Sequence, residues 1–166
     1  LRKTAVITYN APAAFLMLSV RSLPKICVAL GVPDAAHLET IAVASCDHGD
    51  CFLELRLDTL DDPAAGVKVI PKILRRHPDA IILVTCRRKQ NGGEFRGSIA
   101  KQMAVLTAAV EAGATLVDLE IETVEAQPAT AESFAGKTLR VISYHNFERT
   151  PAVKTVLNRL RKYPAE

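Results

Sequence analysis

The sequence predicts an α/β protein made of consecutive strand–helix units whose strands form a parallel sheet. Short apolar runs rich in β-branched residues recur roughly every thirty residues, and segments with helical start signals separate them. With 166 residues, 49% of them hydrophobic and 23% charged, the chain has the size and composition of one globular domain.

The expected strands are nearly continuous apolar runs, which is typical of parallel strands whose outer face is covered by helices. They cover residues 26–30, 51–57, 80–86, 115–121 and 139–144. The expected helices begin, in chain order, at Pro33-Asp34, Asp62-Pro63, Ser98, a less regular segment over 124–134, and Thr150-Pro151. The helix after Ser98 is expected over 99–112. Pro151 is expected in the first turn of the last helix, where its missing N–H group leaves no hydrogen bond unmade.

This periodicity fits two architectures. One is a doubly wound open sheet, and the other is part of a (β/α) barrel, which needs eight such units. The repeat by itself does not distinguish them.

Composition excludes several classes of partner. The formal net charge is +3, aromatic residues make up 5% and Trp is absent, which is unlike a nucleic-acid-binding surface. The apolar stretches are shorter than the ~18–20 residues of a membrane span, so we expect no membrane partner. Cysteines at 27, 46, 51 and 86 are expected to be reduced, as in a cytoplasmic protein.

Polar residues gather where the expected strands end, and this is the end at which parallel α/β folds carry their chemistry. By the two-residue period of a strand, the residues expected on the site face are Glu54, Arg56 and Asp58, then Arg87, then Asp118, Glu120 and Glu122, then Ser143 and His145. Arginine binds carboxylates through a planar fork, and histidine can act as a base near neutral pH. The set therefore predicts a site for an anionic small molecule whose protons must be moved.

A second group of chemistry-bearing residues carries less weight. Cys46, His48 and Cys51 lie close in the sequence, but their spacing matches no standard zinc module, and Cys51 is expected in a core strand. His77 is expected at the surface beside a helix. We therefore predict no metal.

Four short motifs follow one another along the chain: Glu54-Leu55-Arg56-Leu57-Asp58, Thr85-Cys86-Arg87 with Gly92-Gly93, Val117-Asp118-Leu119-Glu120, and Ser143-Tyr144-His145-Asn146-Phe147 with Thr150-Pro151. In this order they resemble type I 3-dehydroquinate dehydratase across about residues 25–166. Each motif alone is weak, and together they are specific. The resemblance implies an eight-stranded (β/α) TIM barrel, of which residues 25–166 form a partial barrel domain of only about five βα units, after an N-terminal extension over 1–24.

The resemblance also implies an activity: the cofactor-free dehydration of 3-dehydroquinate to 3-dehydroshikimate in the shikimate pathway. In the family a lysine forms a Schiff base with the substrate ketone and a histidine moves the protons. By motif match, His145 is the general acid/base and Asp118 its acidic partner. Glu54, Arg56 and Arg87 match substrate-binding positions.

Two substitutions depart from the family pattern. Asn91 stands where the family usually has a histidine-supporting Glu, so we expect a shifted pKa of His145 or compensation by Asp118 or Glu94. Asn146 stands where many members have Asp. The pair His145-Asn146 resembles the version of this motif in fusions of the dehydratase with shikimate dehydrogenase, so one candidate origin of this chain is such a bifunctional protein.

The family's Schiff-base lysine lies on a sixth strand, and the sequence has only Lys89 near the right end of the expected sheet. We therefore expect that lysine beyond Glu166, weak or no activity from this chain alone, and either a homodimer or a complementing C-terminal segment. Two alternatives remain open. One is a catalytically dead regulatory domain that binds dehydroquinate or quinate, and the other is an unrelated five-stranded α/β domain.

Overall fold

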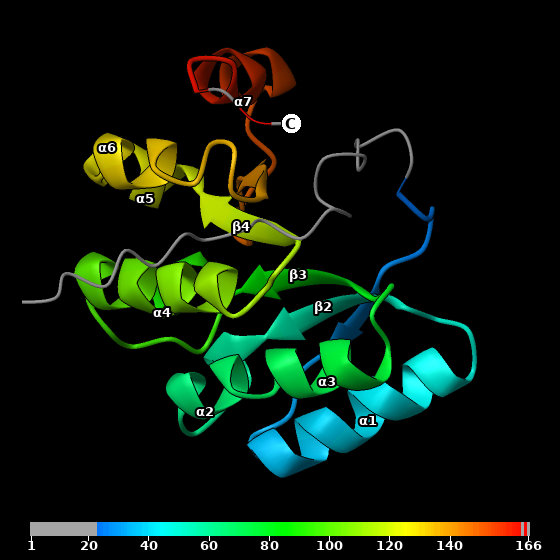
Figure 1. Ribbon diagram of the computed structural model, residues 1–166. Coiled ribbons are helices and arrows are strands. Elements are labelled where there is room, and N and C mark those ends of the chain that lie inside the picture. The colour runs from blue at the N-terminus through cyan, green and yellow to red at the C-terminus, as the bar shows by residue number, and fades with distance from the viewer. Residues whose placement is uncertain (1–22, 164, 166) are drawn as a thin grey trace, which may run out of the picture.

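The computed structural model describes residues 23–163 and 165 and contains one parallel sheet (Figure 1). Its strands are β1 (Val28–Leu30), β2 (Phe52–Arg56), β3 (Ile81–Thr85), β4 (Leu116–Glu120) and β5 (Leu139–Ser143). All five expected strands are confirmed, each slightly shorter than its apolar run. The expected extension over 1–24 lies almost wholly outside the described residues, so that division of the chain stays a prediction.

The order of the strands decides between the two architectures that the periodicity fits, and it confirms the partial barrel that the family resemblance implies. Each strand pairs in parallel with the next one in the chain, so the sheet order is β1-β2-β3-β4-β5. A doubly wound sheet reverses its order at a switch point, whereas a barrel adds its strands in sequence. The fold is therefore a partial (β/α) barrel, and in the part that the structure describes β1 and β5 are open edges.

The helices form an arc around one face of this sheet (Figure 1). They are α1 (Ala35–Asp47), α2 (Pro63–Val67), α3 (Ile70–Arg76), α4 (Ile99–Glu111), α5 (Ile121–Ala126), α6 (Pro128–Glu132) and α7 (Val153–Leu160). Two short 3₁₀ turns, η3 (Leu57–Thr59) and η4 (Lys89–Asn91), follow β2 and β3. The expected helix over 124–134 is two helices, because Pro128 disfavours helical backbone at Gln127, whose φ is −138°.

Three of the expected helix starts are capped as the sequence predicts. Oδ1 of Asp34 accepts a hydrogen bond from the His37 amide at 2.7 Å, and Ser98 caps α4 through the Lys101 amide at 3.3 Å. Asp62 caps α2 in the same way. The prediction for Pro151 is wrong: Ala152 is still extended, at ψ 120°, so α7 begins only at Val153.

The main core lies between the sheet and the helices. Alternate residues of the central strands face the helices and are buried there, namely Leu53, Leu55, Ile82, Val84, Val117 and Leu119. The residues between them face the concave inner side, where the candidate site lies. Packing of the outer face therefore fixes the positions of the inner-face side chains.

Replacing Leu55 by alanine should lower the free energy of unfolding by about 2–5 kcal/mol, because Leu55 is fully buried between β2 and the helices. Urea denaturation followed by circular dichroism measures the change. Val153→Ala is the control, since Val153 is 65% exposed and its truncation should change stability by less than about 0.5 kcal/mol. Equal effects of the two substitutions would contradict this assignment of the core.

Candidate active site

The inner face of the sheet has an apolar layer below a polar layer. The residues that alternate with the helix-facing ones begin as Ile81, Leu83, Leu116 and Leu139, and then become Glu54, Arg56, Thr85, Asp118 and Ser143 towards the carboxyl ends. The pairing register brings the polar residues level with one another: Arg56 pairs with Thr85, and Glu120 pairs with Ser143. The strand-end residues predicted from the sequence therefore share one end of the sheet.

Arg87, Asp118 and His145 form the centre of this polar layer. Arg87 follows β3, and its guanidinium donates a hydrogen bond to Oδ2 of Asp118 at 3.1 Å. Both side chains are largely buried, with 15% and 5% of their surface exposed. His145 follows β5 and lies within electrostatic range of both groups.

Burial and charge set the protonation of this group. The pKa of His145 lies below its ordinary value, chiefly because the ring is partly buried and also because of the positive charge of Arg87; Asp118 opposes the shift. The pKa of Asp118 is raised by burial, and the neighbouring Arg87 opposes this shift. A lowered histidine pKa favours the neutral imidazole, which can accept a proton.

Several polar atoms of the centre are buried without a hydrogen-bond partner among the described residues. They are Nε of Arg87, Oδ1 of Asp118, Oγ of Ser143 and Nδ1 of His145. Buried polar atoms are normally paired, so a cluster of unpaired ones is typical of a site that binds a polar ligand. The sequence alone could not indicate this feature.

The β2 side of the layer holds a second set of charges. Thr85 donates a hydrogen bond to Glu54 at 2.6 Å. Arg56 donates twice to Asp58, at 3.0 and 2.8 Å, which raises the pKa of the guanidinium. Asp58 was expected on the strand face, but β2 ends at Arg56 and Asp58 lies in η3, from which its carboxylate turns back to Arg56.

The Gly92-Gly93 loop after β3 is fixed by close contacts. Gly92 has a φ of +77°, and a side chain there would collide with the ring of Phe147. A Cβ on Gly93 would lie 2.1 Å from the carbonyl oxygen of Arg87. Phe147 in turn stacks against His145, with the ring centroids 6.3 Å apart. The two glycines therefore let the loop approach Arg87 and the histidine segment.

A buried network that the sequence analysis missed supports the loop from the helix side. Glu120 accepts hydrogen bonds from Arg88 at 3.2 Å and from Gln102 at 2.6 Å. Gln102, on α4, also donates to the Cys86 carbonyl and accepts from Thr123. Gln102 carries no sequence signal, because a polar residue in an amphipathic helix normally faces solvent.

The structure corrects the prediction for Glu122. It was expected on the same strand face as Asp118 and Glu120, but β4 ends at Glu120 and Glu122 lies in the first turn of α5. Its carboxylate accepts a hydrogen bond from Asn91 at 3.0 Å and forms an ion pair with Arg159 at 3.0 Å.

These contacts bear on the expected effects of Asn91. The pKa of His145 is lowered by burial and by Arg87, and Asp118 opposes the shift. Asn91 is not among these causes, so its expected effect on the histidine stays a prediction. The groups that act on the histidine pKa do not include Glu94, which instead donates its backbone amide to Asp58.

The opposite end of the sheet corrects two further expectations. Cys51 is half-buried and lies just before β2 rather than inside it, and His77 is also half-buried rather than on the surface. The four cysteines are all described and all free. Within the described residues, no helix is both long enough and apolar enough to cross a membrane.

A parallel sheet with sequential strands, and with charged residues at their carboxyl ends, defines a (β/α)-barrel protein with a strand-end site. The family model described as type I 3-dehydroquinase matches residues 26–165. The chain belongs to that family.

Individual relatives agree with this assignment. The chain is similar to the 3-dehydroquinate dehydratase of Dehalococcoides mccartyi, with 31% identity over 89% of this chain and 61% of that protein. The structure of 3-dehydroquinate dehydratase from Enterococcus faecalis is similar over 84% of this chain and 60% of that chain, with a TM-score of 0.69 and 26% identity. A structure of dehydroquinate dehydratase and shikimate dehydrogenase from S. pombe shares the fold over 82% of this chain and 28% of that chain, with a TM-score of 0.59 and 18% identity. The chain thus spans less than two thirds of these proteins.

The charges around His145 should be visible in its titration. We expect the imidazole to titrate below pH 6.5 in the wild-type chain, and to titrate higher in Arg87→Gln, where an opposing positive charge is removed. Asp118→Asn should lower the pKa further. NMR of the histidine Cε1–H signals measures the pKa of His145 in the wild-type chain and in the two variants. His145→Gln assigns the resonance, and the exposed His37 is the internal control. Shifts in the same direction in both variants would contradict the electrostatic assignment.

Proposed function

We propose that this chain carries the proton-transfer half of a 3-dehydroquinate dehydratase site, the one that converts 3-dehydroquinate to 3-dehydroshikimate in the shikimate pathway. The observation that carries the proposal is the cluster of Arg87, Asp118 and His145 at the carboxyl ends of β3, β4 and β5. Membership of the family and the printed names of the relatives support the choice of reaction.

In this proposal His145 is the general acid/base. Its lowered pKa keeps the ring neutral, so it can take a proton from the carbon beside the substrate carbonyl and then deliver a proton to the departing hydroxyl. Asp118 is a positioning residue, because its negative charge lies close enough to stabilise the imidazolium that forms between the two steps. Asn91 is held by Glu122 in this arrangement and therefore acts on the histidine only indirectly.

The cationic groups of the layer would bind the anionic substrate. Arg87 keeps Nε free of hydrogen bonds among the described residues, and Arg56 is 22% exposed while held by Asp58. Both guanidinium groups therefore have a fixed orientation and donors left for a carboxylate. Glu54, anchored by Thr85, is positioned to accept hydrogen bonds from substrate hydroxyl groups.

The reaction of the family also needs a lysine that forms an imine with the substrate ketone, and we place it outside the described residues. Among the described lysines, Lys89 is the one near the carboxyl ends of the strands, and its side chain is exposed in η4. The open edges at β1 and β5 are where further polypeptide would add, either a complementing segment or a second copy. Because the four cysteines are free, we propose a cytoplasmic location.

Isothermal titration of the 166-residue chain with 3-dehydroquinate tests the binding half of the proposal. Arg87→Gln should weaken binding by at least about tenfold, because it removes a charge-assisted donor worth roughly 1.5–3 kcal/mol. Arg75→Gln, on the exposed side of α3, should leave binding unchanged. Equal affinity in the two variants would contradict a role for the polar layer in binding.

Borohydride reduction tests the placement of the lysine. After incubation with 3-dehydroquinate and borohydride, the intact mass of this chain should stay unchanged and its dehydration rate should be weak or zero. A covalent adduct on Lys89, or turnover like that of a whole enzyme, would contradict the placement. Binding without turnover by a longer protein that includes the further strands would favour the alternative of a regulatory ligand-binding domain.

A further inference from the structure

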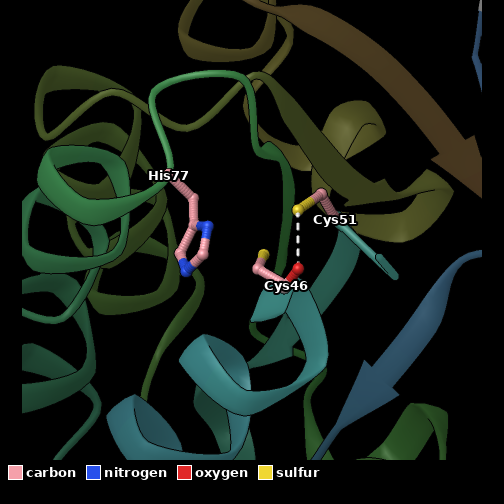
Figure 2. Close-up of side chains that lie close together, drawn as sticks. All are labelled: Cys46, Cys51 and His77. Carbon is pink, nitrogen blue, oxygen red and sulfur yellow. Dashed lines mark hydrogen bonds between the residues drawn. The ribbon is translucent and has the colours of Figure 1, made fainter. Parts of the chain in front are cut away.

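Three potential metal ligands meet at the amino-terminal end of the sheet, opposite the candidate active site. They are Cys46, Cys51 and His77, and their ligand atoms all lie within 4.8 Å of one another (Figure 2). The residues come from the end of α1, the residue before β2 and the end of α3. No residue of this cluster takes part in the polar layer.

The turn between α1 and β2 brings the two cysteines together. Gly49 adopts a φ of +97°, and its amide donates to the Cys46 carbonyl at 2.9 Å, so the chain reverses directly after the helix. The thiol of Cys51 then lies against the end of the helix, 3.7 Å from the carbonyl oxygen of Cys46. The two cysteines, five positions apart in the sequence, therefore lie next to each other in space.

His77 completes the group from a distant part of the sequence. It follows α3, where its amide closes the last turn through a hydrogen bond to Ile73 at 2.8 Å, and its ring is turned towards the two cysteines (Figure 2). Oδ1 of Asp47 lies 3.2 Å from Nε2 of this ring, although without good hydrogen-bond geometry. A carboxylate beside a metal-binding imidazole commonly fixes its orientation.

The histidine next to these cysteines in the sequence is not part of the group. His48 is exposed, and its Nδ1 lies 2.6 Å from the Ala44 carbonyl oxygen of its own helix. The cluster therefore contains both cysteines of the sequence pattern, with His77 in the place of His48.

We propose that Cys46, Cys51 and His77 bind a thiophilic divalent cation such as Zn²⁺, with water in the fourth position and Asp47 orienting the imidazole. Two sulfur ligands and one nitrogen ligand suit zinc. Ligand atoms around tetrahedral zinc lie roughly 3.5–3.8 Å apart, so inward side-chain movement of about 1 Å brings the three atoms to binding distance. The bound ion ties α1, α3 and the start of β2 together. This inference does not rest on the proposed function.

Cobalt binding to the reduced, chelator-treated 166-residue chain tests the site. We expect one Co²⁺ per chain, with the strong visible bands of a tetrahedral site and a thiolate-to-cobalt charge-transfer band, and we expect Zn²⁺ to displace it. Cys51→Ser and His77→Gln should each weaken binding by at least about tenfold. Both positions are only half-buried, so these variants should fold, and circular dichroism checks that they do.

Cys27→Ser and His48→Gln are the matched controls, because they replace a half-buried cysteine and an exposed histidine outside the cluster. Both should retain the cobalt spectrum. Absence of the charge-transfer band in the wild-type chain, or unweakened cobalt binding by Cys51→Ser, would overturn the proposal. So would a chain that holds no metal and instead forms a Cys46–Cys51 disulfide in the presence of reductant, seen as a mass lower by two hydrogens.

Discussion

The pairing of buried charges between β3 and β4 is the constraint on which the polar layer depends. A buried charge is strongly unfavourable unless it is paired and hydrogen-bonded. Two consecutive arginines follow β3, and each binds a carboxylate of β4: Arg87 binds Asp118, and Arg88 binds Glu120, which also accepts a hydrogen bond from Gln102 of α4. The first pair orients groups towards His145, and the second anchors the loop that carries Gly92 and Gly93. Removing one partner from either pair would leave a charge buried alone.

The sequence predicts most of the fold because local signals agree with the tertiary structure. The apolar runs become strands, and Asp34 and Ser98 cap the helices that they were expected to begin. The strand-end residues were found through their alternation with apolar neighbours. That rule failed at Asp58 and Glu122, because it cannot locate the residue at which a strand stops. Periodicity alone did not give the sequential strand order; the family resemblance implied it, and the strand pairing confirms it.

The features that the sequence analysis missed depend on contacts between distant segments. In the sequence, Gln102 looks like an ordinary polar helix residue. Its side-chain amide donates a hydrogen bond to Glu120 only because α4 packs over β3 and β4. Similarly, His77 is 26 residues from Cys51 in the numbering and meets it only when α3 lies beside α1. Both are polar groups whose role is set by packing, which periodicity and spacing do not describe.

The sequential order of the strands also has a consequence for how the chain folds. Among the described residues, every strand pairs with the one made just before it, so none of these pairings must wait for a distant strand to be synthesised. Each pairing closes one strand–helix unit, for example Val28 with Leu53, so its loop-closure cost is lower than that of a pairing between the two ends of the chain. The sheet can therefore grow unit by unit during translation, with each new strand covering the edge left by its predecessor.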